Sequence, residues 1–333
     1  MLKLLKTILI IFIILVITAI AGFIVLMVAS DWNLENFKYV EKEYQVEENF
    51  ESIKLNLKGS DVVIRSSNDE KCKVVCFENN IYSHSIETIN NELVVGCNYK
   101  TKIFFSYKDT TITIYLPEKA YKTFNLTTTS GDVKVENLKV DELTINVSSG
   151  DVEVNNVECN NISTVGESGD VELQNLKVGG SASVTRDSGD VELSNVSCNG
   201  NFSTSTDSGE IGLKNVVCGG LSTECDSGEI GLENVVCGDL STKCDSGDVK
   251  LESVLVNGAL TIEAESGDVK FSKLDASSLD ITTTSGDVKG SLLSDKIFAV
   301  RSSSGDIDVP QTTTGGVCKI TVRSGDIVIT ICK

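Results

Sequence analysis

The 333-residue sequence has almost no histidine, a residue on which many enzyme active sites depend. It contains a single histidine, His84, so no Ser-His-Asp or Cys-His arrangement can be assembled in its C-terminal two thirds. No ligand motif of a metalloenzyme is present either. Positive charge is also limited, and the net charge of −19 argues against binding to nucleic acid or to anionic lipid surfaces. The composition therefore predicts a protein that is not an enzyme and has no nucleic-acid partner.

Aromatic residues are scarce and unevenly placed. All seven tyrosines and the only tryptophan lie at or before Tyr121, and only Phe202, Phe271 and Phe298 lie beyond residue 124. Binding surfaces commonly use exposed aromatic rings as hot spots. The C-terminal two thirds therefore offers no obvious carbohydrate site and no aromatic hot spot for a protein partner.

One short motif, in contrast, is abundant. Ser-Gly-Asp or Ser-Gly-Glu recurs at a nearly constant interval, with its glycine at Gly131, Gly150, Gly169, Gly189, Gly209, Gly228, Gly247, Gly267, Gly286, Gly305 and Gly325. A fixed period of about 20 residues is typical of repeat proteins in which each unit stacks only on its neighbours. The sequence thus predicts a stacked repeat architecture over residues 123–333.

Each repeat is predicted to be a coil of short β-strands. With the motif glycine as position zero, positions +2, +4 and +7 are almost always aliphatic, as in Val191, Leu193 and Val196, and helical spacing is absent. Coils stacked in register form parallel sheets that rise about 4.8 Å per coil. The predicted fold class is all-β: a single-stranded parallel β-helix, or β-solenoid, with about eleven coils of roughly 19–20 residues each. An irregular β cap and one transmembrane helix are expected to precede it.

Two neighbouring repeats are almost copies of each other. Residues 211–229 and 230–248 differ at four positions, and two of the differences exchange charge, since Lys214 becomes Glu233 and Glu224 becomes Lys243. Equivalent positions of adjacent coils lie above one another, so two opposite-charge pairs are predicted, worth a few tenths of a kcal/mol each.

Asparagine recurs at position +6 of successive repeats, which predicts a ladder of stacked side-chain amides. Its members are Asn137, Asn156, Asn175, Asn195, Asn215 and Asn234.

Acidic residues form two predicted columns that flank the Ser-Gly pair, at positions −2 and +1. The structural interpretation is that these carboxylates accept hydrogen bonds from turn N–H groups. The alternative is Ca²⁺ or Mg²⁺ bound between them, since hard cations prefer several oxygen ligands; no other cofactor is predicted. The candidate ligands are Glu167, Asp170, Asp187, Asp190, Asp207, Glu210, Asp226, Glu229, Asp245, Asp248, Glu265 and Asp268.

The eleven cysteines follow the same period. Four of them occupy position +9, where other coils have valine, which indicates small buried hydrophobic residues. Cys225 and Cys244 form a second column at position −3, and a four-thiolate metal site between the two columns is a less favoured alternative. If the solenoid lies outside the membrane, free buried thiols indicate an anaerobic host. The alternative is that the solenoid lies in the cytoplasm, where thiols stay reduced.

The segment TITIYLPEKAYKTFNLTTTSGDVKVENL (residues 111–138) and the SGDV units that follow it resemble the bacterial "putative adhesin" β-solenoid family. This domain of unknown function, also called the toastrack fold, occurs in LiaG-like and YvlB-like envelope proteins. The resemblance covers about residues 50–333. It implies no catalytic residues, and it implies a membrane-associated context in envelope stress.

The N-terminal region predicts a membrane anchor. Residues 8–28 form an uncharged apolar run, and a helix needs about 20 such residues to cross the bilayer. Lys3 and Lys6 precede the run, whereas Asp31 and Glu35 follow it, which favours a cytoplasmic N-terminus and an extracytoplasmic solenoid. The triplet Ala19-Ile20-Ala21 resembles a signal-peptidase site, but the apolar residues that continue after it favour an uncleaved, single-pass anchor in the cell membrane.

Four segments are expected: residues 1–30 with the transmembrane helix, a stalk at 31–45, the irregular cap at 46–122, and the regular solenoid at 123–333. The strand with Ile327, Ile329 and Ile331 is still in phase with the repeat and is expected to leave its outer edge unpaired. One hypothesis is that this C-terminal coil joins a second copy end to end. The other is a frayed last strand.

Three functions remain open. The favoured one is a non-catalytic, membrane-anchored scaffold that presents a rigid acidic rod to protein partners at the cell envelope, in envelope stress response. The alternative is a cell-surface adhesin. A weaker alternative is a module that responds to divalent cations through the acidic columns.

Overall fold

The computed structural model describes residues 2–29, 38–99 and 110–332, and these ranges hold one helix and 26 strands, which confirms the all-β class. The helix is α1 (Leu2–Ala29). The strands are β1 (Val40–Val46), β2 (Ser52–Leu57), β3 (Asp61–Ser67), β4 (Cys72–Glu78), β5 (Tyr82–Ile89), β6 (Glu92–Tyr99), β7 (Thr111–Pro117), β8 (Ala120–Ser130), β9 (Val133–Glu136), β10 (Lys139–Ser149), β11 (Val152–Asn155), β12 (Glu158–Ser168), β13 (Val171–Val178), β14 (Ala182–Ser188), β15 (Val191–Ser208), β16 (Ile211–Ser227), β17 (Ile230–Cys237), β18 (Leu240–Ser246), β19 (Val249–Glu252), β20 (Leu255–Ser266), β21 (Val269–Ser285), β22 (Val288–Leu292), β23 (Lys296–Ser302), β24 (Ile307–Asp308), β25 (Gly316–Ser324) and β26 (Ile327–Ile331).

The structure bears on two predictions for the N-terminal region, the membrane span and the stalk. Among the described residues, no helix combines the length and apolar character needed to cross a membrane, so the predicted span at residues 8–28 is not confirmed. Residues 31–37, nearly half of the predicted stalk, lie outside the described residues. Residues 40–45, also part of the predicted stalk, form most of strand β1, which pairs antiparallel with β4.

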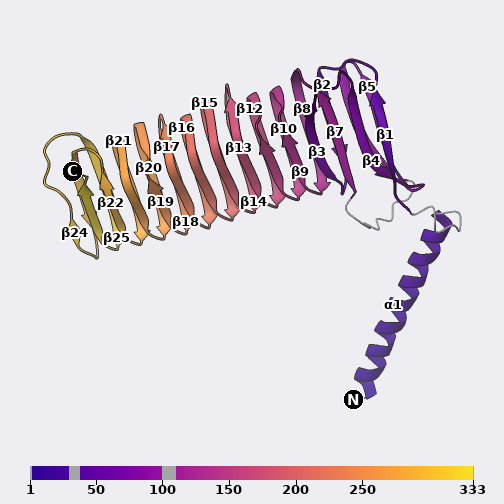
Figure 1. Ribbon diagram of the computed structural model, residues 1–333. Coiled ribbons are helices and arrows are strands. Elements are labelled where there is room, and N and C mark those ends of the chain that lie inside the picture. The colour runs from indigo at the N-terminus through magenta and orange to yellow at the C-terminus, as the bar shows by residue number, and fades with distance from the viewer. Residues whose placement is uncertain (1, 30–37, 100–109, 333) are drawn as a thin grey trace.

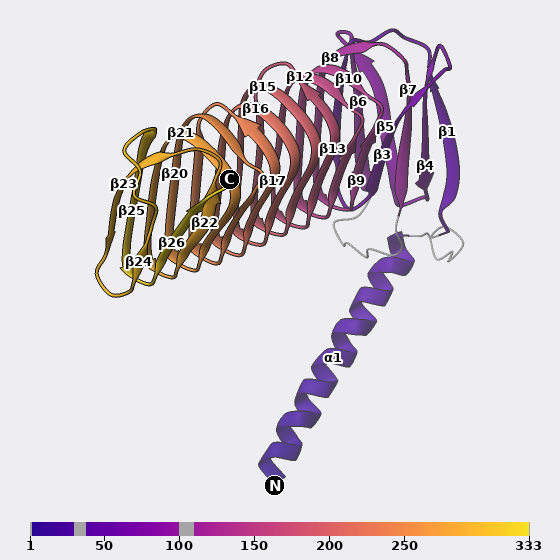
Figure 2. The same cartoon turned by 60° about the vertical axis from the view of Figure 1, so that its left-hand side comes forward.

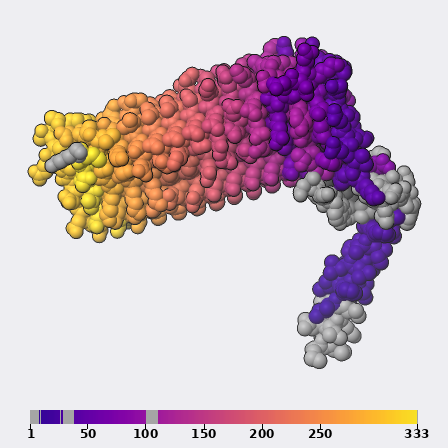
Figure 3. Space-filling view, viewed as in Figure 1, coloured from indigo at the N-terminus to yellow at the C-terminus, as the bar shows by residue number. Residues whose placement is uncertain are grey.

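The strands wind into a parallel β-solenoid of about 10 turns, close to the predicted eleven (Figure 1). In the regular coils, strand residues pair with their equivalents one repeat away, as Val191 of β15 pairs with Ile211 of β16 and Ile211 with Ile230 of β17. Figure 2 shows the successive coils lying one behind another. On the face shown in Figure 3, the described coils form an even surface along the rod.

Alternation along each strand produces a continuous core. In β16 the side chains of Ile211, Leu213, Val216 and Cys218 are buried, and the equivalent residues of the adjacent coils are buried with them. Positions +2, +4, +7 and +9 therefore point inward, as predicted. Each fully buried aliphatic side chain contributes about 1.5–3 kcal/mol relative to an exposed one, so the stacked columns are the main source of stability.

At the N-terminal end, coils do not stack in sequence order. Strands β2 and β3 lie between β6–β7 on one side and β8–β9 on the other. Val62 pairs with Val133, which places Ser60-Asp61-Val62 in register with the first repeat motif, at Gly131. Antiparallel strands β5, β4 and β1 cover the outer side of this end.

The C-terminal end shows the same reversal, and it corrects a prediction. Strand β26 pairs with β22 on one side and with β24 on the other, and β25 lies between β21 and β23. The strand with Ile327, Ile329 and Ile331 is therefore not the outermost strand, because the coil of β23 and β24 lies beyond it. The prediction that this strand is the free edge is wrong, and end-to-end association through it loses its basis.

Candidate functional site

The Ser-Gly-Asp corner accounts for both the glycine and the close stacking of coils. The motif glycines have φ values from +101° to +149°, which L side chains rarely adopt. A Cβ atom at these positions would lie only 1.8–2.4 Å from a carbonyl oxygen of the neighbouring coil. Each Ser-Gly-Asp or Ser-Gly-Glu repeat therefore needs glycine here for its backbone angle and for its contact with the neighbouring coil.

The +1 carboxylates form a ladder along this corner. The Oδ1 atom of one aspartate accepts a hydrogen bond from the backbone N–H of the +1 residue in the next coil, at 2.7–3.0 Å. The ladder begins at Asp61 in the cap, is interrupted between Glu210 and Asp248, and ends at Asp306 in the outermost coil. Like charges at this spacing repel by about 1 kcal/mol per pair in water, and these charge-assisted hydrogen bonds offset the repulsion.

The twelve predicted cation ligands are brought into two columns but not into a compact ligand shell. All twelve are among the described residues, and no three of them place ligand oxygens within 4.8 Å of one another. Near one end of the rod, lysines also neutralise the +1 column, since Lys270 Nζ lies 2.9 Å from Asp268 Oδ2 and Lys289 Nζ lies 2.7 Å from Asp287 Oδ2. Cation binding by the acidic columns therefore stays a prediction.

The two predicted charge pairs are present. Lys214 Nζ lies 2.9 Å from Glu233 Oε2, and Lys243 Nζ lies 2.8 Å from Glu224 Oε1. Both pairs join equivalent positions of adjacent coils, as the near-identical repeats indicated. All four side chains are substantially exposed, so each pair is worth only a few tenths of a kcal/mol.

The asparagine ladder is also present, with one interruption. Amide–amide hydrogen bonds join Asn137 to Asn156, and a second series joins the last four members, but Asn175 Nδ2 donates to Asn155 and not to Asn156. The six asparagines also have φ values of +53° to +56°. Asparagine tolerates this left-handed conformation better than most residues. The positive φ is therefore a second reason why asparagine recurs at position +6, and the repeat pattern alone did not reveal it.

One lateral face of the rod carries a shallow groove of about 720 Å³. Position +3 of seven successive coils lines it, with acidic residues at one end, two glycines in the middle and lysines at the other end. The glycines leave the backbone bare, and a Cβ atom at Gly212 would meet nothing within 4 Å. In stacking order these residues are Glu172, Glu192, Gly212, Gly231, Lys250, Lys270 and Lys289.

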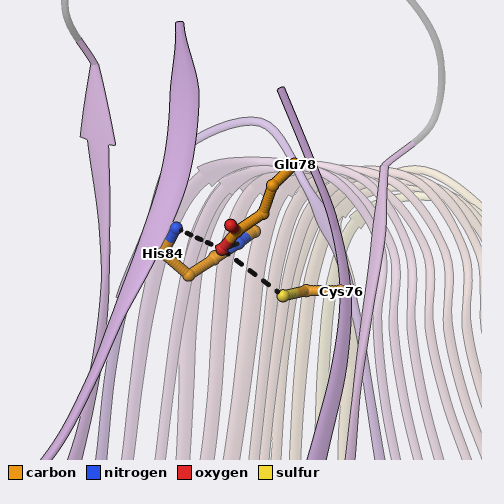
Figure 4. A group of neighbouring side chains, drawn as sticks. All are labelled: Cys76, Glu78 and His84. Atoms are coloured by element: carbon orange, nitrogen blue, oxygen red, sulfur yellow. Dashed lines mark hydrogen bonds and ion pairs between the residues drawn. The ribbon is translucent and has the colours of Figure 1, made fainter. Parts of the chain in front are cut away.

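A buried polar cluster lies in the N-terminal cap. Alternation in β4 turns Cys76 and Glu78 to the same interior side, and β5 turns His84 toward them. The tight turn between the strands is fixed by Asn79 Oδ1, which accepts hydrogen bonds from the N–H groups of Ile81 and Tyr82 at 2.8 Å. Figure 4 shows the three side chains converging.

Glu78 is the centre of this cluster. Its Oε1 accepts the His84 backbone N–H at 2.8 Å and lies 3.3 Å from His84 Nδ1, and the Cys76 thiol points at it from 3.7 Å. Its Oε2 accepts the Tyr44 hydroxyl at 3.0 Å and lies 3.1 Å from Lys42 Nζ. The carboxylate is only 2% exposed, yet both of its oxygens have partners.

A chain of hydroxyl groups continues from the far side of the imidazole. His84 Nε2 lies 2.9 Å from the Tyr82 hydroxyl, which lies 2.8 Å from Ser60 Oγ, and Ser60 Oγ lies 2.9 Å from Thr110 Oγ1. All four residues are buried. The chain therefore holds the imidazole in one orientation.

The protonation states argue against nucleophilic catalysis here. Burial, reinforced by the charge of Glu78, raises the pKa of the Cys76 thiol to about 12. Burial also lowers the pKa of His84, against the opposing effect of Glu78. A neutral, buried thiol directed at a carboxylate is a poor nucleophile, so the cluster does not form a Cys-His catalytic pair. The repeat pattern missed it, although Cys76-Phe77-Glu78 has the two-residue alternation that places both side chains together.

Comparisons with known proteins find solved structures at low sequence identity. A comparison with curated protein sequences finds no similar protein. The solved structure of a "putative adhesin" from Parabacteroides distasonis ATCC 8503 is 14% identical, covering 76% of this chain and 97% of that one, with a TM-score of 0.44. A "putative adhesin" from Bacteroides fragilis NCTC 9343 is 15% identical, covering 89% and 98%, with a TM-score of 0.32. A "putative lipid binding protein" from P. distasonis is 15% identical, covering 88% and 97%, with a TM-score of 0.34.

These structural likenesses are too distant to carry an argument about function. The sequence match to a family model is stronger, because the Toastrack DUF4097 model matches residues 50–216 and again residues 200–333. Together the two matches span the cap and the whole solenoid. The chain therefore belongs to the Toastrack DUF4097 family.

Proposed function

We propose that the protein is a non-catalytic interaction module that presents a rigid acidic rod at the cell envelope and binds a protein partner along its lateral groove. The charge order of the groove carries this proposal. Along position +3, two glutamates, two bare glycines and three lysines follow one another in successive coils, while position +5 adds Lys214, Glu233 and Glu252 to the lining. Such an arrangement suits an extended protein segment that is basic at one end and acidic at the other.

The regular shape of the rod supports binding rather than catalysis. Between residues 110 and 292 of the described chain, strands follow one another with short connections, and the interior is filled by buried aliphatic columns. Catalytic clefts are usually built from longer loops. The groove is shallow and charged side chains line it, which fits a surface that recognises charge and shape.

Attachment to the membrane through residues 8–28 is part of the proposal. The described apolar side chains of this segment are exposed, with Phe12 at 62%, Leu15 at 61% and Phe23 at 56%. A contiguous exposed apolar surface marks a site of membrane or protein interaction. With the N-terminus in the cytoplasm, the solenoid would face the outside, and protease accessibility in intact cells tests this topology.

Cross-linking in intact cells tests the proposed partner surface. Reversing the three groove lysines (Lys250→Glu, Lys270→Glu and Lys289→Glu) is expected to remove the cross-linked partner. The matched control reverses Lys139, Lys243 and Lys319, which form similar exposed ion pairs outside the groove. A partner that survives the groove reversal, or that is lost equally in the control, contradicts the proposal.

The identity of the partner separates two roles. A partner from the same envelope supports a scaffold in envelope stress response, whereas a host or matrix molecule supports a cell-surface adhesin. A response to divalent cations is a weaker proposal, which rests on the two carboxylate columns. Thermal unfolding with and without millimolar Ca²⁺ tests it, and an unchanged midpoint rejects it.

A further inference from the structure

We propose that Cys76, Glu78 and His84 bind one Zn²⁺ ion that fastens the N-terminal cap. The three potential ligand atoms lie within 4.8 Å of one another, and among the described residues no other group of three or more His, Cys, Asp or Glu side chains does so. One sulfur, one nitrogen and one oxygen donor suit zinc, whereas Ca²⁺ and Mg²⁺ prefer oxygen ligands alone.

The distances fit a tetrahedral ion. With zinc–ligand bonds of about 2.0–2.3 Å, two oxygen or nitrogen ligands lie about 3.3 Å apart and a sulfur–oxygen pair about 3.6 Å apart. Glu78 Oε1 lies 3.3 Å from His84 Nδ1, and Cys76 Sγ lies 3.7 Å from the same oxygen. Two of the three ligand–ligand distances therefore match a tetrahedral ion, and the third, between Cys76 and His84, is within 4.8 Å.

The surroundings already provide what a metal-bound histidine and carboxylate need. A metal-ligating histidine almost always donates its other ring N–H to a fixed partner. His84 Nε2 faces the Tyr82 hydroxyl at 2.9 Å, and this hydroxyl is held by Ser60. Glu78 keeps Tyr44 and Lys42 on its second oxygen, so Oε1, which also accepts the His84 backbone N–H, is the atom that would face the ion.

The Cys76 thiol is the weakly satisfied member of the cluster without a metal. The thiol of Cys76 is completely buried, and its contact with Glu78 is a long 3.7 Å, where a sulfur donor forms only a weak hydrogen bond. On binding, the thiol would release its proton to solvent, and the thiolate and carboxylate together would balance the two charges of Zn²⁺. Three protein ligands leave the fourth tetrahedral position for a water molecule.

The ion would connect several elements of the cap. Its ligands come from β4 and β5, while their immediate partners come from β1 and from Ser60, the residue in register with the first motif glycine. The antiparallel strands that cover the end of the rod would thus be tied to its first stacked corner. Zinc is therefore expected to stabilise the cap more than the distal coils.

Cobalt spectroscopy on the purified full-length chain tests the site, because Co²⁺ bound to a thiolate in tetrahedral geometry gives a charge-transfer band. All variants carry Cys332→Ser, since Cys332 is exposed and would bind metal nonspecifically. One equivalent of Co²⁺ is expected to produce the band in the chelator-treated protein, and Zn²⁺ is expected to abolish it. His84→Gln should weaken binding by at least about tenfold.

Cys76→Ser and Cys72→Ser form the decisive pair. Both cysteines are buried in β4, but only Cys76 belongs to the cluster. The band is expected to disappear in Cys76→Ser and to remain in Cys72→Ser. Circular dichroism checks that each variant folds, and Glu78→Gln gives an independent reading at a different ligand. Absence of the band in the parent protein, its survival in Cys76→Ser, or equal loss in Cys72→Ser would overturn the proposal.

Discussion

The requirement for glycine at the Ser-Gly-Asp corner can be tested at Gly228. Its φ is +149°, and a Cβ atom there would lie 2.0 Å from the carbonyl oxygen of Gly209 and 2.7 Å from its carbonyl carbon. The substitution Gly228→Ala must therefore push two coils apart as well as strain the backbone. Gly212→Ala, three residues after the preceding motif glycine, is the matched control, because a Cβ there meets nothing within 4 Å.

The expected cost is the sum of two effects. A non-glycine residue in this region of φ costs about 1–3 kcal/mol. Separating the coils also weakens the hydrogen bonds that join them, from Gly209 N–H to Ser227 O at 3.0 Å and from Ile211 N–H to Glu229 O at 2.9 Å, at about 1 kcal/mol each. Together Gly228→Ala is expected to destabilise the protein by about 3–5 kcal/mol. Gly212→Ala should be neutral or stabilising by up to about 1 kcal/mol, since alanine reduces the entropy of the unfolded chain.

Urea denaturation with amide hydrogen exchange measures both variants. Because coils contact only their neighbours, the loss is expected to be local, with faster exchange in β15, β16 and β17 than in the distal coils. A Gly228→Ala variant that is as stable as Gly212→Ala, to within about 1 kcal/mol, would refute the stacking argument.

Three further predictions concern individual contacts. Arg186 is 1% exposed and its Nε and Nη2 atoms have no partner, so Arg186→Met, which keeps most of its length, should stabilise by about 1–3 kcal/mol in urea denaturation. Lys214→Glu should destabilise by a few tenths of a kcal/mol, and adding Glu233→Lys should restore stability; no recovery in the double variant would contradict the pairing. Hydrogen bonds from lysine side chains are the main cause of the lowered pKa values of Asp268 and Asp287. A hydrogen bond from a backbone N–H of the next coil is the second cause. The stability that these two ionised carboxylates contribute is therefore complete above about pH 4 and is lost as the pH falls through the lowered folded-state pKa. A pH series of thermal midpoints should show a decline only in acid.

The regular part of the rod could be predicted from sequence because its period determines its neighbours. Once the repeat length is known, the partner of each residue follows, and this is why the Lys214–Glu233 pair and the buried columns were predicted correctly. The same reasoning found the asparagine ladder. It did not reveal the positive φ of these asparagines, because a column of identical residues does not by itself distinguish a side-chain ladder from a turn requirement.

The two ends could not be predicted in the same way. Every coil presents a similar Ser-Gly-Asp corner, so the hydrogen bonds of any one coil can be completed by almost any other. At the C-terminal end Ser324 pairs with Ser285 and passes over the motif at Gly305, and at the N-terminal end Val62 pairs with Val133. A search for the period of a single coil does not detect pairs that pass over one or more coils, and the prediction of an exposed last strand failed for this reason.

The Cys76–Glu78–His84 cluster was missed for a related reason. It depends on an antiparallel pairing in the cap, where no repeat links one strand to the next. The alternation within β4 could have indicated that Cys76 and Glu78 share a face. That His84 faces them from β5 depends on the turn at Asn79, and the sequence gives only weak evidence for that turn.

Because the corners are interchangeable, the order of the coils must be specified by features that differ between them. Two columns hold such features. The guanidinium of Arg186 occupies the space that a side chain at Gly166 would fill, since a Cβ atom there would lie only 1.6 Å from Nη1, and the ring of Phe271 fills the equivalent space at Gly290, at 2.2 Å. Each large side chain fits only beside its own glycine, so stacking against any other coil would create a clash on one side and a cavity on the other. The break in the +4 column at Gly290, which interrupts the aliphatic pattern, is therefore the complement of Phe271, and it helps to fix which coils are neighbours.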